Sequence, residues 1–282
     1  MSTALVCIAK MEHNYIVEWV EYYLYIGFDA IYVYENDKEP KYAEMLKEYP
    51  QVIVIPFPQD GSVTRSVQYH MLEHFCANFK DKYKWIAHFD CDEFLVLKNH
   101  KKIQEFCQEY LGNEEGGIGV NWLIFGDNGH KTYSPEPVTF RFTKRESIKE
   151  TSKSYIKCIV CSSCIDKYID FHIPNLKKGH IRNTRGDILT SREVDQTILD
   201  VVQLNHYMCK SREEFGRKKI RGQAGVPSSH PNKFGRGLGG RYDISFFLKN
   251  NKNEVEDCSA KVIYEACLAN KLRKDTSELS PK

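Results

Sequence analysis

The feature that most constrains the fold is an alternation of apolar strand-like runs and helix-like segments over the first third of the chain. Each run is four to seven residues long and rich in Val, Ile, Tyr or Ala, and each intervening segment places apolar residues at helical spacing or ends in a turn residue. The predicted strands are 3–9, 29–34, 52–55 and 85–89, and the predicted helices are 14–27, 40–49 and 63–80.

This alternation is typical of a parallel sheet covered by helices on both faces. Such sheets bind ligands beyond the carboxyl ends of their strands. We therefore expect the loops that follow Ile8, Tyr34 and Phe89 to face one crevice.

The remainder of the chain has a more mixed pattern. Its predicted strands are 118–125, 138–142, 155–160 and 201–204, and its predicted helices are 211–222 and 259–271. The sequence contains no internal repeat and no linker-like stretch. We predict an α/β protein in two parts, 1–115 and 116–282, which form one continuous domain with 223–282 as an extension.

Composition excludes several classes of protein. Lys and Arg number 40 against 38 for Asp and Glu, and this near-neutral balance argues against a nucleic-acid binder. No run of apolar residues is long enough for a transmembrane helix, and the N-terminus lacks a basic signal-peptide region. Aromatic residues make up 12%, which makes disorder improbable. With no secretion signal to support disulfides among the ten cysteines, we expect a soluble protein of the cytoplasm.

Three of the cysteines are closely spaced, at Cys158, Cys161 and Cys164. A structural zinc site normally has four ligands, and the first of these cysteines lies inside an alternating strand pattern. We favour a cysteine-rich hairpin and keep a metal site as the alternative. The glycine-rich segment 235–241 does not follow a strand, so we interpret it as a mobile loop rather than a phosphate-binding loop.

The strongest chemical signal is the run 89–94, in which Asp90, Asp92 and Glu93 directly follow a buried strand. Carboxylates this close raise one another's pKa unless a cation neutralises them. Mn²⁺ or Mg²⁺ is the natural partner, because both prefer oxygen ligands and can bridge a diphosphate. The alternative is a solvated acidic turn. His206, at the end of the predicted strand 201–204, is a further candidate ligand or a packed histidine.

These residues belong to a series of blocks that resembles the glycosyltransferase 2-like and family 92-like group of sugar transferases. The first is Cys7-Ile8-Ala9-Lys10-Met11-Glu12, and the most specific is the Asp-x-Asp-Glu-Phe block at 90–94. The match runs in order through 7–12, 18–22, 27–37, 85–95, 121–130, 157–160 and 205–222. The resemblance implies the GT-A fold, a Rossmann-like, mostly parallel sheet flanked by helices, with a mixed β/α part that binds the acceptor.

The resemblance also implies a metal-dependent hexosyl- or pentosyltransferase. Such an enzyme moves a sugar from a nucleotide-diphosphate donor, here expected to be a UDP-sugar, to a hydroxyl of a glycan or glycoconjugate, with inversion.

The roles that we assign follow the matched positions. Asp90, Asp92 and His206 are expected to bind Mn²⁺ or Mg²⁺, and Asp127 and His130 are candidates for the general base. Trp122 and Tyr207 are expected to bind the acceptor sugar. The residues expected to bind the nucleotide sugar are Lys10, Asp37, Arg65, Gln68, Asp90, Lys157, Lys210 and Arg221.

Two other classes compete with this reading. A nucleotidyltransferase would usually carry a glycine-rich basic loop after the first strand, and 10–14 contains no glycine. The other alternative is a non-catalytic glycan-binding or scaffold protein on a degenerate transferase fold, against which Asp90, Asp92 and His206 argue. The sequence does not identify the sugar, the acceptor or the oligomeric state.

Overall fold

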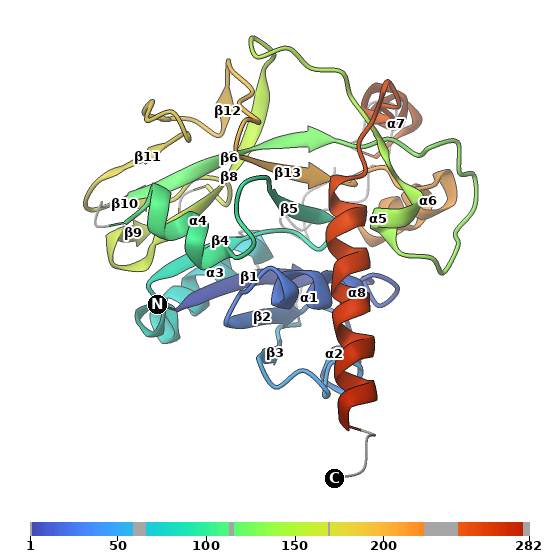
Figure 1. The fold of residues 1–282 in the computed structure, drawn as a ribbon, viewed down its shortest axis with the longest axis horizontal. Coiled ribbons are helices and arrows are strands. Elements are labelled where there is room, and N and C mark those ends of the chain that lie inside the picture. The colour runs from blue at the N-terminus through green and yellow to red at the C-terminus, as the bar shows by residue number, and fades with distance from the viewer. Residues whose placement is uncertain (1, 59–65, 113–115, 169, 223–241, 279–282) are drawn as a thin grey trace.

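A single large sheet crosses the molecule in the computed structural model, which describes residues 2–58, 66–112, 116–168, 170–222 and 242–278. Ten strands of the described residues belong to it, and eight of them follow the order β3-β2-β1-β4-β8-β6-β13-β5 (Figure 1). Those eight are β1 (Thr3–Ala9), β2 (Ala30–Glu35), β3 (Val52–Pro56), β4 (Trp85–His88), β5 (Glu93–Leu97), β6 (Gly116–Ile124), β8 (Ser154–Cys161) and β13 (Val202–His206). β11 (His180–Arg182) adds to β6 and β12 (Glu193–Val194) to β8.

Most of these strands run in one direction. The pairs β1–β2, β2–β3, β1–β4 and β6–β13 are parallel, whereas β8 is antiparallel to both β4 and β6, and β5 is antiparallel to β13. The carboxyl ends of β1, β2, β4, β6 and β13 therefore share one edge. Strands from both sides of the predicted division at residue 115 belong to this one sheet, and the division itself stays a prediction.

Helices cover both faces of the sheet and create two apolar cores. On one face α1 (Ile16–Tyr25) buries Trp19, Val20 and Tyr23, and on the other α3 (Val67–Asn78) buries Met71, Leu72 and Phe75. Alternate residues of the same strands point into the two cores, as Leu5 and Val6 do. The α/β class with a mostly parallel, Rossmann-like sheet is confirmed.

The other helices are α2 (Tyr42–Met45), α4 (Ile103–Tyr110), α5 (Val138–Arg141), α6 (Arg212–Arg221), α7 (Ile244–Asn250) and α8 (Ser259–Glu278), with 3-10 turns η1 (Lys80–Lys82) and η2 (Ser162–Cys164). Two small antiparallel pairs complete the structure: β9 (Ile165–Lys167) with β10 (Asn175–Leu176), and β7 (Lys144–Arg145) with β14 (Val255–Glu256). None of the described helices is both long and apolar enough to cross a membrane.

The predicted strand at 138–142 is wrong, because 138–141 form the short helix α5. The buried carboxylate of Glu18, on α1, accepts hydrogen bonds from the backbone N–H groups of Val138 (2.7 Å) and Thr139 (2.9 Å). It also accepts the Thr139 hydroxyl at 2.8 Å. These are N–H groups that the first turn of a helix leaves without partners, so a distant acid fixes this turn as helical.

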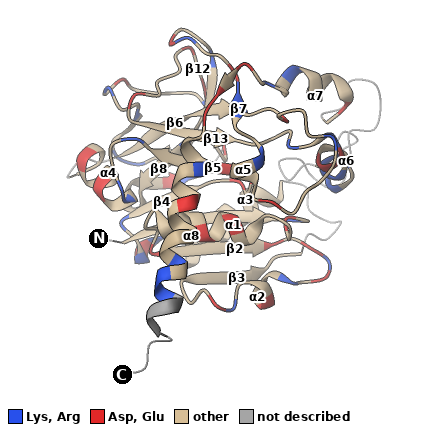
Figure 2. Cartoon of the chain, turned by 45° about the vertical axis from the view of Figure 1, so that its right-hand side comes forward, with Lys and Arg blue, Asp and Glu red and all other residues tan. Residues whose placement is uncertain are grey.

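The helix α8 fastens the C-terminal part to the first helix of the chain. It runs past α5 and α1 along one side of the molecule (Figure 1). The Glu21 carboxylate, on α1, accepts the hydroxyls of Tyr49 (2.6 Å) and Tyr264 (2.7 Å) and pairs with the Lys271 ammonium at 2.6 Å. Figure 2 shows that many charged residues lie on helices and loops, whereas the strands β2 and β3 are mostly uncharged.

A buried ion pair anchors α6 to α5. The Arg141 guanidinium donates to both carboxylate oxygens of Glu214, at 2.8 and 2.9 Å, and both side chains are 1% exposed. Glu214 also accepts the Tyr15 hydroxyl at 2.8 Å and closes the capping box of Ser211 at the start of α6. This bidentate pair holds α6 at the carboxyl edge of the sheet.

We expect Glu214→Gln to lower the free energy of unfolding at pH 7 and to matter less in acid. Burial alone would raise the pKa of Glu214, but the hydrogen bonds and charge of Arg141 lower it from an ordinary 4.5 to about 2. A lowered pKa stabilises the fold above pH 4.5, and that contribution fades as the pH falls from 4.5 through 2. At about 1.4 kcal/mol per pKa unit, the contribution at pH 7 is about 3 kcal/mol.

Urea unfolding of the wild type and Glu214→Gln at pH 7 and pH 3 measures this effect. The matched control is Glu213→Gln, because Glu213 is the exposed neighbour on the same turn. A difference between wild type and Glu214→Gln that is equally large at both pH values would contradict the assignment.

Candidate active site

The loops after β1 and β2 are joined at the predicted crevice. Both carboxylate oxygens of Asp37 accept the backbone N–H of Met11, at 3.0 and 3.1 Å, and one accepts the Tyr42 hydroxyl at 2.8 Å. A cavity of about 350 Å³ opens here between Lys10, Lys38 and Tyr42. Burial lowers the pKa of Lys10 against the attraction of Asp37. The structure thus brings Lys10 and Asp37 together, with Asp37 shaping the loop.

The acidic run forms a tight turn between β4 and β5. The backbone N–H of Glu93 donates to the carbonyl of Asp90 at 3.0 Å, and the Glu93 carboxylate accepts the N–H of Asp90 at 2.8 Å. The Glu93 carbonyl accepts the Trp19 indole N–H and the Tyr23 hydroxyl, each at 3.0 Å. Side chains of α1 therefore hold the turn from beneath, which gives a structural reason for aromatic residues at these helix positions.

Asp90 is held from two sides. One carboxylate oxygen accepts the side-chain N–H of Gln68 at 3.1 Å, and the other lies 3.2 Å from the Lys157 ammonium. Lys157 is 0% exposed and its ammonium also lies 3.6 Å from Glu93. Burial would lower the pKa of Lys157, but Asp90 and Glu93 raise it. Lys157 is therefore a buried counter-charge for these acids, and the prediction that it binds the nucleotide sugar does not fit this position.

Asp92 and His206 meet at the end of β13. His206 Nε2 lies 3.5 Å from one Asp92 carboxylate oxygen, and Lys218 Nζ lies 2.6 Å from the other. Burial would raise the pKa of Asp92, but the charges of Lys218 and His206 hold it well below its usual range. Burial lowers the pKa of His206 despite Asp92, so its imidazole is neutral at pH 7. Asp92 is thus an ionised acid beside a neutral imidazole.

This pair fits two ligands of a divalent ion. A neutral imidazole and an ionised carboxylate are the forms that bind metal, and their 3.5 Å separation leaves both atoms free to face one ion. Asp90 points to Lys157 instead. Among the described residues, no group of three or more His, Cys, Asp or Glu side chains is arranged to bind a metal ion. The structure therefore unites two of the three predicted ligands, and the remaining positions would fall to substrate or water.

Basic side chains from α6 and the loop before it surround a small cavity beside Asp92. The cavity, of about 60 Å³, is bordered by Lys210, Lys218 and Arg221. The Lys210 ammonium lies 4.4 Å from the centre of the Tyr15 ring, and burial lowers its pKa. No described residue accepts a hydrogen bond from that ammonium, and the negative charges of Asp92 and Glu214 partly offset the effect of burial on its pKa. Arg221 pairs with Glu12.

Aromatic rings line the other side of the Asp92–His206 pair. The centre of the Trp122 ring lies 4.3 Å from that of His206 and 5.5 Å from that of Tyr155. Trp122 is nearly buried, whereas Tyr155 is 38% exposed. Tyr207 is 1% exposed and packs on Phe125 in the core. Trp122 therefore borders the site by its contact with His206 and has Tyr155 as its exposed neighbour, whereas Tyr207 offers no ring face to a ligand.

The two candidate bases lie in the loop after β6. The Asp127 carboxylate accepts the backbone N–H of Gly129 at 2.9 Å and the side chain of Asn253 at 3.3 Å, which are bonds that shape a turn. The His130 imidazole contacts the Phe142 ring at 5.6 Å between centroids, and no described residue forms a hydrogen bond with it. Of the two, His130 keeps the freer side chain.

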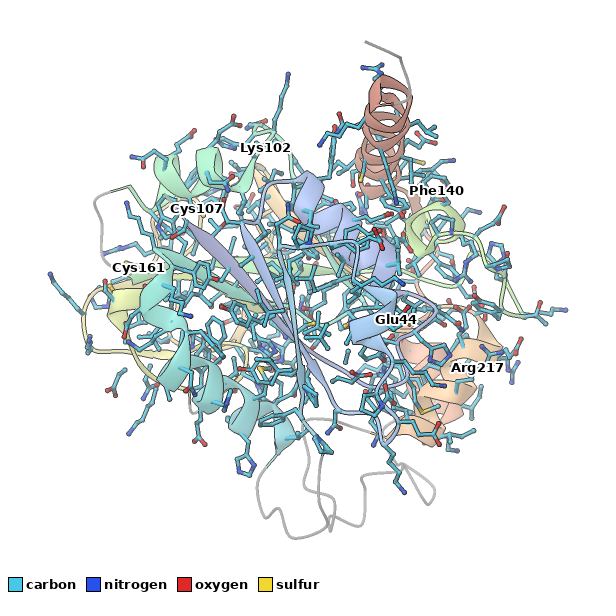
Figure 3. All side chains as sticks on the ribbon, turned by 90° about the horizontal axis from the view of Figure 1, so that it is seen from below. Glu44, Lys102, Cys107, Phe140, Cys161 and Arg217 are labelled. Atoms are coloured by element: carbon cyan, nitrogen blue, oxygen red, sulfur yellow. The ribbon has the colours of Figure 1, made fainter. Side chains whose placement is uncertain are left out.

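Some predictions fall elsewhere. Arg65 and the glycine-rich segment 235–241 lie outside the described residues. The three clustered cysteines lie in β8 and in η2, and none of them is in a disulfide. Figure 3 places Cys161 on the opposite side of the molecule from Arg217 of α6, which lines the basic cavity. These cysteines are not part of the candidate site.

Sequence reasoning assigned no role to three residues that the structure places at the site. Lys218 was in a matched block, but a lysine on a basic helix face is usually solvated. Glu93 carried no signal beyond its acidic neighbours. Tyr155 stood in a strand pattern that predicts only alternation, not which face is open to solvent.

Comparisons with known proteins agree on one family. The sequence model of glycosyltransferase family 92 matches residues 2–225. A family 92 protein of Ricinus communis is 25% identical over 228 residues, which cover 76% of this chain and 37% of the relative. One of Oryza sativa subsp. japonica is 22% identical over 161 residues, covering 54% and 26%. The chain thus spans about a third of the length of these curated relatives.

Two solved structures share a distant likeness with the chain. HddC from Yersinia pseudotuberculosis has a TM-score of 0.36 at 10% identity, with 62% of this chain and 83% of that chain covered. A 4-diphosphocytidyl-2C-methyl-D-erythritol synthase has a TM-score of 0.37 at 12% identity, with 68% and 94% covered. Likeness at this level says nothing about activity.

Proposed function

Because this chain belongs to glycosyltransferase family 92, we propose that it is a glycosyltransferase that moves a sugar from a nucleotide-diphosphate donor, a UDP-sugar, to a hydroxyl of a glycan or glycoconjugate. The observation that carries the proposal is the adjacency of two opposite features at the carboxyl edge of the sheet. The ionised Asp92 beside neutral His206 suits a divalent ion, and the almost buried Lys210 ammonium beside them has no hydrogen-bond acceptor among the described residues. A metal-bound diphosphate supplies both partners.

The donor is proposed to lie along this edge. The nucleoside end occupies the cavity of about 350 Å³ at Lys10, where the Asp37 loop closes one side. The diphosphate then reaches the basic cavity at Lys210 and Arg221. Asp90, oriented by Gln68 and Lys157, faces the sugar or ribose hydroxyls as a hydrogen-bond acceptor.

Asp92 and His206 are the residues that would hold Mn²⁺ or Mg²⁺. When bound, such an ion supplies positive charge to the diphosphate as it leaves. The chain's own contribution is to keep Asp92 ionised in a buried place and His206 neutral, and to set Lys210 where the phosphate charge develops.

The acceptor is proposed to lie against the exposed ring of Tyr155, which Trp122 supports from behind. Aromatic faces pack on the apolar faces of sugar rings, so this wall orients the hydroxyl that attacks. Transfer with inversion requires a base at that hydroxyl, and His130 is the candidate with an imidazole free to accept a proton.

A donor screen tests the function. The protein is incubated with a panel of nucleotide sugars, with Mn²⁺ and with a chelator, and release of the nucleotide is measured. We expect turnover of a UDP-sugar that needs the ion. If UDP with Mn²⁺ raises the melting temperature but no donor turns over with any glycan acceptor, the non-catalytic glycan-binding alternative replaces the enzyme.

A further inference from the structure

Lys218 forms an ion pair with Asp92, the carboxylate that is proposed to bind the metal ion. Its ammonium lies 2.6 Å from one oxygen of Asp92 and 3.1 Å from the carbonyl of Met208. The Asp92 oxygen on the other side faces His206. The carboxylate therefore already has a full positive charge in contact with it.

A divalent ion and this ammonium compete for the same charge. Two cations within a few ångströms of one carboxylate repel each other, and the repulsion is strong where water is largely excluded. Lys210 adds positive charge from the same cavity, while the pairs Arg221–Glu12 and Lys157–Asp90 add no net charge. An ion that binds Asp92 is therefore favoured when Lys218 moves away.

The basic cavity offers the Lys218 ammonium a second position. Its side chain is 11% exposed and borders the basic cavity of about 60 Å³ that holds Lys210 and Arg221. A lysine carries its charge on a flexible four-carbon stem, so a small rotation transfers the ammonium from Asp92 to an anion in that cavity.

We propose, resting on the proposed function, that Lys218 is an exchangeable positioning residue. It neutralises Asp92 while the site is free of metal, and it leaves Asp92 for the donor diphosphate when the divalent ion binds. The exchange keeps Asp92 paired in both states, which avoids an uncompensated buried charge. It also couples binding of the metal to binding of the donor, because the displaced Lys218 ammonium then pairs with the diphosphate.

The experiment measures metal binding without turnover. Free Mn²⁺ is followed by electron paramagnetic resonance during titration of the wild type, Lys218→Met and the control Lys219→Met, whose lysine is exposed on the same helix. We expect Lys218→Met to bind Mn²⁺ about tenfold more tightly. With Mn²⁺ saturating, we expect it to bind UDP about tenfold more weakly. Lys219→Met should match the wild type in both titrations.

A merely structural ion pair gives a different result. Mn²⁺ affinity in Lys218→Met that equals or falls below that of the wild type overturns the exchange. Lys218→Gln is the second variant, and its circular dichroism and melting temperature check the fold. If neither variant folds, the lysine is a structural element and the inference fails. Donor turnover by the wild type is independent of these titrations, so a failed exchange leaves the proposed function standing.

Discussion

Asp92→Asn is expected to lower donor turnover by about a hundredfold or more while the protein stays folded. Asparagine keeps the shape of the side chain but removes the negative charge that faces both His206 and Lys218. The variant therefore loses the anionic ligand of the proposed ion, and Lys218 remains as an unopposed positive charge. Removing one preorganised electrostatic group from an active site typically costs 10²–10³ in rate.

The measurement is nucleotide release from the donor that the screen identifies, with Mn²⁺ varied from zero to saturation. The matched control is Asp81→Asn, because the Asp81 side chain is 84% exposed and pairs only with the neighbouring Lys80 among the described residues. Melting temperatures show whether Asp92→Asn remains folded. Turnover by Asp92→Asn within a few-fold of the wild type would remove Asp92 from the site.

The sequence predicted the parts of the molecule that local patterns determine. The strands β1, β2, β3 and β4 were predicted because each is a short apolar run between helical segments. Their parallel arrangement placed Asp90 and Asp92 at the edge where the loops meet, and the structure confirms that edge. His206 was found by its place at the end of an apolar strand, although only the fold shows that it faces Asp92.

Tertiary contacts account for what the sequence did not predict. Val138 and Thr139 have strand propensity, and the segment is helical because Glu18, 120 residues earlier, accepts their N–H groups. Strand β5 was missed because its first residue belongs to the acidic run, and the four apolar residues that follow were not recognised as a separate strand. Tyr207 was predicted to bind the acceptor because the sequence does not show how deeply a side chain is buried. In the structure it lies in the core.

Lysines were the hardest residues to place. Lys157 and Lys218 look alike in sequence, each a basic residue near a motif. One sits at 0% exposure between two acids, and the other borders a cavity. The difference depends on β8 running antiparallel between β4 and β6, which brings Lys157 under the acidic turn. No local pattern in the sequence specifies that pairing.

Lys157→Met is expected to destabilise the protein by about 3–5 kcal/mol at pH 8, because it removes the cation shared by two buried carboxylates. Asp90 keeps the Gln68 hydrogen bond, but Glu93 has one oxygen without a partner among the described residues. Burial raises the pKa of Glu93 well above its usual range even with the lysine present. Without Lys157, the Glu93 carboxyl at pH 8 must either stay ionised and unpaired in the folded protein or take up a proton on folding.

The loss of stability in Lys157→Met should therefore depend on pH. A raised carboxyl pKa means that the folded protein holds a proton that the unfolded chain has released, so folding weakens as the pH rises. Urea unfolding should therefore show a larger loss at pH 8 than at pH 5. The double variant Lys157→Met with Glu93→Gln should recover part of the loss and flatten its pH dependence, because the neutral amide needs no counter-charge.

The control Lys153→Met removes an exposed lysine just before the same strand, and its effect should stay within about 0.5 kcal/mol. If the loss of stability in Lys157→Met is equal at pH 5 and pH 8 and is not relieved by Glu93→Gln, the lysine stem is needed for packing alone. Partial rescue, in contrast, would assign the buried lysine an electrostatic task. It would hold the acidic turn folded so that Asp92, one residue before Glu93, can present its charge on the other side of the turn.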